Sequence, residues 1–257
     1  METPRKPLPT RVDQTPDLPS AYVTALRHGL DGLGVELRVE ARAAIDGHAR
    51  LLLAWTGAIN LTAIREPGGV ALGHVVDSLS ALPTLRKHGV DRFLDLGSGG
   101  GYPGLPLAVA LPARRALLVE PIGKKARFLD TVVEAIGLRG IAEAATVRAE
   151  TLAGDPRHRG RWPAVTARAV GSLADLVELA FPLLAPGGIL VAWKRGDLAA
   201  ELAAAHRAVD ALGGGSLEIV PVDVSGLDGH RLVIGTVTGR VPAAFPRDPG
   251  ARKRRPW

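Results

Sequence analysis

The chain is 257 residues long and 46% hydrophobic, so it can bury the core of one large domain without a partner. It contains no cysteine, which excludes disulfides, thiolate metal sites, iron–sulfur clusters and any reaction through a protein thiol. The formal net charge of +6 favours a polyanionic partner. Arginine supplies 26 of the 32 basic residues beside abundant Ala, Gly and Pro, as codon bias would produce, so charge favours nucleic acid only slightly.

Proline and charge dominate the first residues, which predicts a disordered N-terminal extension over residues 1–19. This stretch has no apolar signal-peptide core, and no later run could span a membrane, so we expect a cytoplasmic protein with no membrane partner. Tyr22, Leu26 and Leu30 then share one helical face. Further helical patterns over 39–55 and 70–85 predict a helical N-terminal region spanning residues 20–89.

From about residue 90, short apolar runs alternate with helical segments, as in a doubly wound α/β sheet. The last two runs are joined by a short connection with Gly226 and Gly229, too short for a crossover helix, so they should pair antiparallel. Residues 90–240 are thus predicted to form a Rossmann-like α/β core, a mostly parallel seven-stranded sheet with an antiparallel last strand. A basic C-terminal tail, residues 241–257, follows. The predicted strands are 92–96, 116–120, 145–148, 164–167, 189–193, 219–224 and 232–238, and the predicted helices between them are 103–110, 124–136, 173–184 and 198–212.

A glycine-rich turn follows the first predicted strand and leads into a helix. Gly97, Gly99 and Gly101 let the backbone approach a bound nucleotide closely. Pro103 suits the first turn of a helix, where its missing N–H costs nothing. Gly99, Gly101 and Gly104 also match the dinucleotide motif G-x-G-x-x-G, so an NAD(P)-dependent oxidoreductase is one alternative.

Charged residues at the strand ends favour a different cofactor. Asp95, two residues before the first glycine, would repel a pyrophosphate but attract the cationic amino and sulfonium groups of S-adenosyl-methionine, directly or through water. Glu120 ends the second strand, where it can accept hydrogen bonds from both ribose hydroxyls. Ala149 and Glu150 follow the third predicted strand and can edge the adenine, and Arg168 follows the fourth. These positions predict S-adenosyl-methionine as cofactor and methyl transfer as the reaction.

The methyl acceptor is narrowed by what the chain lacks. Carbon-5 methylation of pyrimidines needs a cysteine nucleophile, and the chain has none. An Asn-Pro-Pro-Tyr type motif, which orients an exocyclic amine, is also absent. Guanine N7 carries an available lone pair, so its methylation needs mainly proximity and alignment. N7 is therefore favoured, while a methyltransferase acting on a protein or small molecule, or a non-catalytic RNA-binding or ribosome-assembly factor, stays open.

Six features in order resemble one known family. They are Asn60-Leu61-Thr62-Ala63-Ile64, His74-Val75-Val76-Asp77-Ser78-Leu79, the loop from Asp95 to Pro106, Arg168-Ala169-Val170, Lys194 with Gly196, and Phe245-Pro246-Arg247 through Pro256. Over about residues 40–257 they are similar to the glucose-inhibited division protein B family. The resemblance implies a class I S-adenosyl-methionine-dependent methyltransferase fold and methylation of guanine N7 in 16S ribosomal RNA of the small ribosomal subunit. We further expect a monomer without a bound metal.

The resemblance also implies roles for particular residues. The resemblance places the family's cofactor contacts on Gly97, Tyr102, Ala149, Glu150 and Arg168, with Glu120 as the ribose ligand. These positions agree with the residues chosen from the strand ends. Lys194 is foremost among the residues that should position the substrate, since an ammonium can pair with a phosphate or a base oxygen. The predicted substrate-positioning set is Lys194, His74 and Asp77; the cofactor set is Asp95, Gly97, Gly99, Gly101, Tyr102, Glu120, Ala149, Glu150 and Arg168; the RNA set is Asn60, Arg195, Arg231, Arg252, Lys253, Arg254 and Arg255.

Two positions depart from the family pattern. Gly73 stands where the family commonly has arginine, and His230-Arg231 reverses the common Arg-His order. Both lie on the expected RNA side, so they leave the predicted cofactor contacts intact. For His74 itself, a buried, hydrogen-bonded helix histidine is an equally good interpretation.

Overall fold

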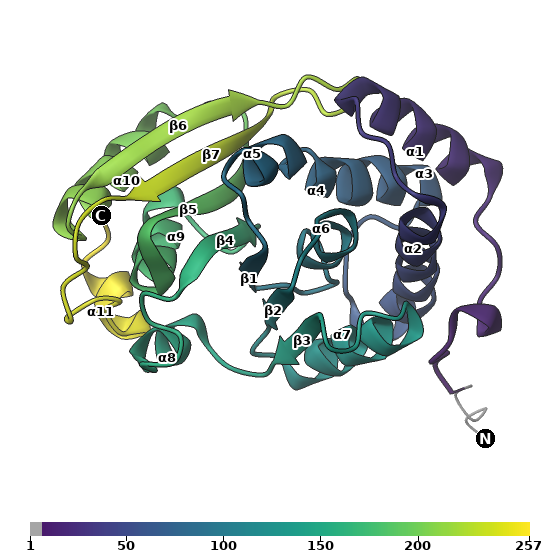
Figure 1. The fold of residues 1–257 in the computed structure, drawn as a ribbon, viewed down its shortest axis with the longest axis horizontal. Helices are drawn as coiled ribbons and strands as arrows, with labels where there is room; N and C mark the ends of the chain where they lie inside the picture. The colour runs from purple at the N-terminus through teal and green to yellow at the C-terminus, as the bar shows by residue number, and fades with distance from the viewer. Residues whose placement is uncertain (1–6) are drawn as a thin grey trace.

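The computed structural model describes residues 7–257, and over these residues the chain forms one seven-stranded sheet covered by helices on both faces (Figure 1). The strand order is β3-β2-β1-β4-β5-β7-β6, and β7 runs antiparallel to both of its neighbours. The predicted fold class, mostly parallel with an antiparallel last strand, is confirmed. The strands are β1 (Arg92–Leu96), β2 (Arg115–Val119), β3 (Ala142–Ala145), β4 (Trp162–Arg168), β5 (Leu184–Arg195), β6 (Gly215–Pro221) and β7 (His230–Val237).

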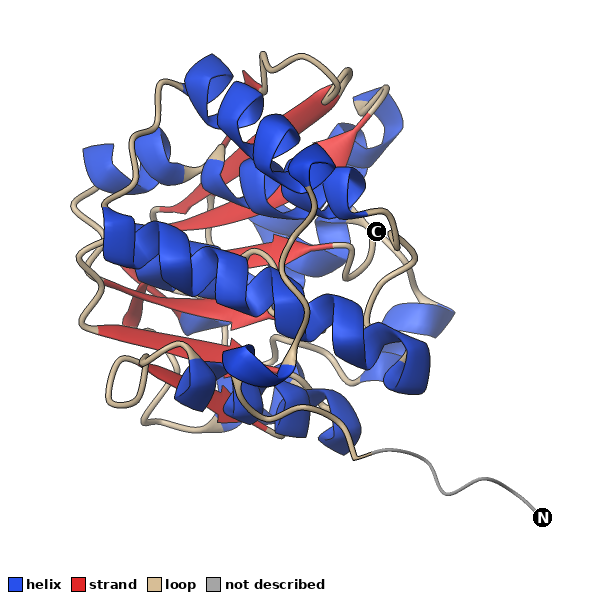
Figure 2. Cartoon of the chain, turned by 90° about the vertical axis from the view of Figure 1, so that its right-hand side faces the viewer, coloured by secondary structure: helices blue, strands red, loops and turns tan. Residues whose placement is uncertain are grey.

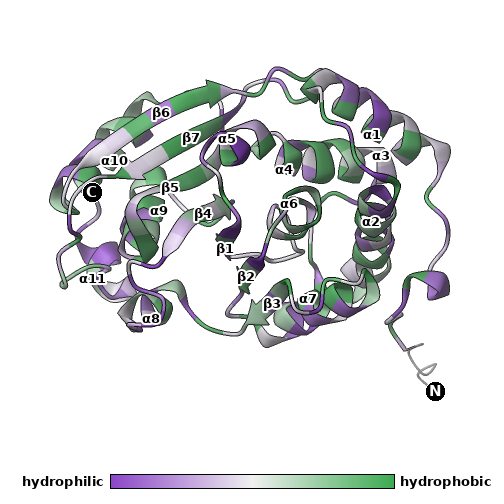
Figure 3. Cartoon of the chain, in the orientation of Figure 1, coloured by the Kyte–Doolittle hydropathy of each residue, from purple (hydrophilic) through white to green (hydrophobic). Residues whose placement is uncertain are grey.

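The helices divide between the two faces of this sheet. Figure 2 shows them around the sheet, and the hydropathy colours of Figure 3 show green, hydrophobic stretches in both helices and strands. The N-terminal helices are α1 (Ser20–Leu33), α2 (Val39–Ile59), α3 (Pro67–Val70), a π-helical turn η2 (Ala71–Val76), α4 (Asp77–Leu79) and α5 (Leu82–Lys87). The later helices are α6 (Gly104–Ala110), α7 (Gly123–Ala135), α8 (Ala149–Gly154), α9 (Leu173–Ala180), a 3-10 turn η3 (Phe181–Leu183), α10 (Ala199–Ala211) and α11 (Pro249–Arg254).

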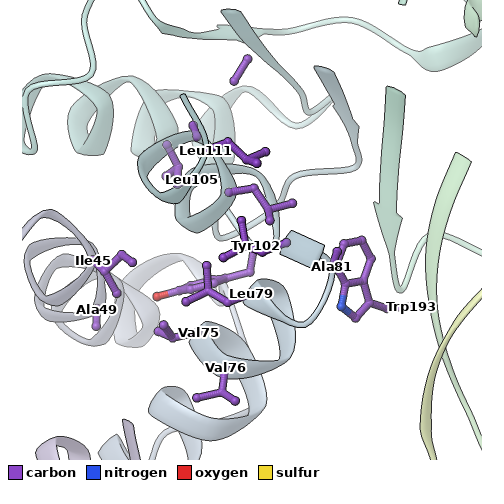
Figure 4. Packing of buried hydrophobic residues seen from close by; sticks show 14 of the residues in the cluster. Ile45, Ala49, Val75, Val76, Leu79, Ala81, Tyr102, Leu105, Leu111 and Trp193 are labelled. Carbon is purple, nitrogen blue, oxygen red and sulfur yellow. The ribbon is translucent and has the colours of Figure 1, made fainter. Parts of the chain in front are cut away.

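Alternation along the strands creates the two halves of the core. Phe93 of β1 points into a cluster with α2, α6 and α7, whereas Leu94 and Leu96 point into a cluster with α8, α9 and α10. The N-terminal helices share the first cluster with the sheet, so they form one unit with it. Figure 4 shows part of this cluster, in which Tyr102 lies among side chains of several helices, including Leu79.

Residues 7–19 correct the prediction of a disordered extension. Thr15 is buried, Trp55 Nε1 donates to the carbonyl of Pro9 at 2.7 Å, and Arg50 Nε donates to Thr15 Oγ1 at 3.0 Å. Proline and polar residues leave carbonyl and hydroxyl acceptors free, and side chains of α2 bind them. The rest of the predicted extension, residues 1–6, lies outside the described part of the chain.

Other segments also differ from the sequence-based boundaries; the sixth strand, for example, is Gly215–Pro221 rather than 219–224. The third strand is Ala142–Ala145 rather than 145–148, because the following residues turn into α8, a helix that the prediction lacked. Small alanines carry a weak strand signal, and their pairing with β2 decides the position. The expected helix over 70–85 is broken into η2, α4 and α5, with Pro83 in the first turn of α5.

Candidate functional site

The turn between β1 and α6 is built from glycines held in the left-handed region. Gly97, Gly99 and Gly101 have φ of 68°, 52° and 88°. A Cβ on Gly101 would lie 2.5 Å from Leu105 and 2.9 Å from His48, so a larger residue would have to displace these side chains and would be strained by the left-handed φ. Because these glycines carry no side chains, the backbone of the turn is bare at the carboxyl end of the sheet, where a ligand can approach it closely.

Asp95 lies beneath this turn, fully buried. Thr166 Oγ1 donates to Asp95 Oδ1 at 2.7 Å, and Ser98 Oγ donates to the Asp95 carbonyl at 3.0 Å. Burial raises the pKa of the carboxyl to about 6, although the hydrogen bond from Thr166 opposes this. The carboxyl joins β1 to β4 and lines neither the cavity beside β2 nor the one beside the turn, so its part in cofactor binding, directly or through water, stays a prediction.

Three cavities lie in a row along the carboxyl ends of the strands. We call them the β2 cavity, the loop cavity and the β5 cavity; their volumes are about 450, 260 and 370 Å³. Gly97, Lys125 and Ala169 line both of the first two, and His74, Arg168 and Ala169 line both of the last two. Together they form one continuous groove, as expected at the crevice of an open α/β sheet.

The β2 cavity brings together the predicted ribose and adenine residues. Glu120 is 4% exposed and accepts the backbone N–H groups of Gly99 at 3.0 Å and Ile122 at 2.9 Å. Ala149 and Glu150 lie in the first turn of α8 and line the same cavity. Glu120 and Glu150, about 30 positions apart in the sequence, therefore line one space of nucleoside size.

The C-terminal tail reaches this cavity too. Arg252 of α11 forms an ion pair with Glu150, and both side chains line the β2 cavity. Arg247 anchors the tail through a 2.6 Å ion pair with Glu178, which is fully buried, and Trp257 Nε1 donates to the same carboxylate at 2.7 Å. Arg252 is thus ion-paired with Glu150 in the fold, and its contact with RNA stays a prediction, while the neighbouring Lys253, Arg254 and Arg255 are exposed.

Asp77 is the centre of the polar network beside the β5 cavity. It is 3% exposed, and its two carboxylate oxygens bind different partners. His230 Nδ1 lies 2.8 Å from Oδ1, and Arg168 Nη1 donates to Oδ2 at 2.9 Å. Trp193 Nε1 donates to the Asp77 carbonyl at 2.7 Å. Through its carboxylate and its carbonyl, Asp77 therefore joins α4 to β4, β5 and β7.

His74 is half-buried in the π-helical turn η2 and lies at the groove, and its role in positioning the substrate stays a prediction. It is hydrogen-bonded on both ring nitrogens, to Arg168 Nη2 at 2.8 Å and to Thr62 Oγ1 at 2.7 Å, and it lines the loop and β5 cavities. Burial, followed by the nearby Arg168 charge, lowers the pKa of His74 to about 3, so the ring is neutral at pH 7. Its ring stacks on Tyr102 at 4.8 Å, and Tyr102 stacks on His48 at 4.2 Å.

Lys194 lines the β5 cavity, but its ammonium already has partners. Nζ donates to the carbonyl of Gly171 at 2.9 Å and lies 2.6 Å from Glu201 Oε2. The Lys194 side chain is 11% exposed. Its charge is therefore largely neutralised within the fold, which limits its role as a free phosphate contact.

The remaining predicted RNA residues lie at the edge of this region or outside it. Arg195 is exposed and lies opposite His230 in the β5–β7 register, and Arg231 lies opposite Lys194. Asn60 ends α2 with a left-handed φ of 53°, and it does not line any of the three cavities.

Three residues that the prediction did not single out belong to the groove. Thr62 and Lys125 line the loop cavity, and His230 lines the β5 cavity. Thr62 lies inside the segment from Asn60 to Ile64, which carries part of the family resemblance, so the sequence contained a signal for it. His230 was seen merely as a departure from the family pattern, because its contact with Asp77 spans 153 positions that no local pattern connects.

Solved structures define the class of this fold. An O-methyltransferase from Bacillus cereus in complex with SAH superimposes with a TM-score of 0.53 at 16% identity, covering 75% of this chain and 91% of that one. A methyltransferase from Geobacter sulfurreducens superimposes with a TM-score of 0.50 at 16% identity, covering 88% and 100%. The fold is that of the class I S-adenosyl-methionine-dependent methyltransferases.

The sequence places the chain within that class. A family model described as rRNA small subunit methyltransferase G (GidB) matches residues 42–225. Ribosomal RNA small subunit methyltransferase G of Dehalococcoides mccartyi (strain CBDB1) is 38% identical over 232 residues, covering 90% of this chain and 98% of the relative. The protein of that name from Roseiflexus sp. (strain RS-1) is 40% identical over 205 residues, covering 80% and 87%. The chain belongs to the rRNA small subunit methyltransferase G family, which confirms the resemblance and the prediction of a methyltransferase that uses S-adenosyl-methionine.

Among the residues that the structure describes, no helix is long and apolar enough to cross a membrane. The same residues contain no cluster of three or more His, Asp or Glu side chains that could hold a metal ion.

Proposed function

We propose that S-adenosyl-methionine binds along the β2 and loop cavities and that the acceptor base enters the β5 cavity. Glu120 has the burial and position to hold the ribose hydroxyls, and Ala149 and Glu150 edge the adenine. The methionyl part then follows Gly97 into the loop cavity, beside Tyr102 and its neighbours. The residues fit this cofactor because a narrow glycine turn separates two adjoining spaces of nucleoside and amino-acid size.

We further propose that the acceptor is N7 of a guanine in 16S ribosomal RNA of the small subunit. The printed names of the relatives support a small-subunit rRNA substrate. The observation that carries the choice of N7 is that three titratable groups at the β5 cavity are already committed: neutral His74 uses both nitrogens, Asp77 binds two donors and Lys194 is ion-paired. N7 already has a lone pair, so such a site needs to align the base rather than deprotonate it.

S-adenosyl-methionine supplies a methyl group on a cationic sulfonium. Transfer to N7 leaves the positive charge on the base, so no proton has to be removed. The chain's own task is to hold the acceptor ring in line with that methyl group. Arg168 and His74 lie where the loop and β5 cavities meet, and their mutual hydrogen bond fixes the wall at that point.

A second acceptor class is favoured by one contact. His230 donates through Nδ1 to Asp77, which leaves Nε2 available in the β5 cavity. Such a nitrogen could accept a proton from an exocyclic amine or a hydroxyl. The product of the reaction distinguishes this class from N7 methylation.

We also propose that the exposed cations Arg195, Lys253, Arg254 and Arg255, with half-buried Arg231, contact RNA phosphates, and that the protein acts as a monomer in the cytoplasm. Transfer of labelled methyl from S-adenosyl-methionine to small ribosomal subunits that lack the modification tests the substrate. Label in the RNA fraction, lost in Glu120→Ala, supports the proposal. Label in protein, or none with RNA, contradicts it.

A further inference from the structure

Thr62 is the end of a hydrogen-bonded chain that starts at Arg168. The loop between α2 and α3 places Thr62 Oγ1 2.7 Å from His74 Nε2 and 3.0 Å from the backbone nitrogen of Ile64. On the other side of the imidazole, Arg168 Nη2 lies 2.8 Å from His74 Nδ1. The Asn-Leu-Thr and His-x-x-Asp-Ser segments therefore meet here. This contact gives a structural reason for the presence of both segments in the chain.

The directions of these hydrogen bonds follow from the chemistry of the groups. A guanidinium can donate but cannot accept, so His74 Nδ1 must offer a lone pair to Arg168. The neutral His74 ring then carries its proton on Nε2 and donates it to Thr62 Oγ1. Ile64 N–H donates to the same oxygen. Both acceptor sites of the Thr62 hydroxyl are thereby used, and its own proton remains to be donated elsewhere.

The free proton has the loop cavity within reach. Thr62 lines that cavity together with Gly99 and Lys125. Among the residues that the structure describes, Thr62 Oγ1 makes hydrogen bonds with His74 and Ile64, both of which are donors to it. A threonine with a free hydroxyl proton and a lysine, which line the same cavity, together suit an anionic group.

We propose that the Thr62 hydroxyl, with the Lys125 ammonium, binds the α-carboxylate of S-adenosyl-methionine. This inference rests on the proposed placement of the cofactor and names the residues that recognise its amino-acid end. The α-ammonium cannot accept a hydrogen bond and the sulfonium repels cations, so the carboxylate is the matching group at that end. The chain from Arg168 through His74 to Thr62 then fixes the carboxylate relative to the junction where methyl transfer occurs.

The test compares two ligands by calorimetry. S-adenosyl-homocysteine has the α-carboxylate, whereas 5′-methylthioadenosine lacks the whole amino-acid end. Thr62→Val should weaken S-adenosyl-homocysteine binding by about tenfold or more, as for loss of a hydrogen bond to a charged group, and change methylthioadenosine binding less than about twofold. Lys125→Met should show the same selectivity, and Thr62→Ser should restore affinity to within about threefold of the parent.

The control is Thr131→Val on α7, whose hydroxyl donates within its own helix to Arg127 and should affect neither ligand. Equal losses for both ligands in Thr62→Val would mean that Thr62 supports the fold of the site, which overturns the inference, and so would unchanged affinity. A parent protein that binds neither ligand would instead overturn the proposed placement of the cofactor. The two failures are therefore distinguishable.

Discussion

At the scale of single residues, Asp95 gives the clearest pH-dependent prediction. Its carboxyl is expected to have a pKa near 3.8 in the unfolded chain and about 6 in the fold. Between these values the folded protein holds a proton that the unfolded chain releases, so this contribution to stability is present at low pH and lost as the pH rises through 6. Asp95→Asn removes this pH-dependent contribution to stability. The free energy of unfolding of the variant, relative to the parent, should rise by up to about 3 kcal/mol from pH 4 to pH 7, measured by urea titration. A difference independent of pH would contradict the assignment.

His230 is the residue that separates the two acceptor classes. If N7 is methylated, His230→Gln should lower kcat less than about tenfold, because the base needs no deprotonation, and the rate should stay flat from pH 7 to 8.5. If Nε2 of His230 is a general base, the loss should be about 100-fold or more. Single-turnover transfer rates with saturating S-adenosyl-methionine measure this. Arg195→Gln is the matched control, because Arg195 lies opposite His230 in the strand register. This variant removes a neighbouring side chain at the same place in the sheet and keeps Nε2 of His230.

At the scale of elements, the tail is held by one buried carboxylate. Glu178 of α9 is fully buried, and Arg247 is its ionic partner. Arg247→Met should lower the free energy of unfolding by about 3–5 kcal/mol, because it leaves a buried charge without its partner. The double variant Arg247→Met with Glu178→Gln should recover part of the loss, and Arg255→Met, at an exposed position, should change stability little. A single variant as stable as the parent would show that the tail is not anchored there.

The elements also show what periodicity could and could not predict. Strand β1 was predicted residue for residue, because an apolar run precedes an unmistakable glycine turn. β3 was misplaced by about three residues, because its alanines carry little strand preference and pairing with β2 selects them. The helix expected over 70–85 is interrupted by the π-helical turn η2, which contains His74, and π-helical turns are often found at functional sites. Amphipathic periodicity does not distinguish such a turn from a continuous helix.

At the scale of the whole molecule, the fold class and the position of the groove were predictable, because parallel strands must end at one edge. The contacts within the groove were not. Asp77 meets His230 and Arg168 across 153 and 91 positions, and Glu150 meets Arg252 across 102, so packing of the complete chain alone brings them together. That packing removes Asp95 from the cavity wall and neutralises Lys194, two outcomes that residue type and strand position cannot indicate.

The most direct measurement is the identity and position of the methylated nucleoside after reaction with small ribosomal subunits that lack the modification. Digestion and mass spectrometry identify the nucleoside, and cleavage at N7-methylguanosine maps it. We expect N7-methylguanosine at a single position of 16S ribosomal RNA, with the same product from the His230→Gln variant. A methylated amine or ribose hydroxyl, or N7-methylguanosine scattered over many positions, would contradict the proposed alignment of one guanine in the β5 cavity.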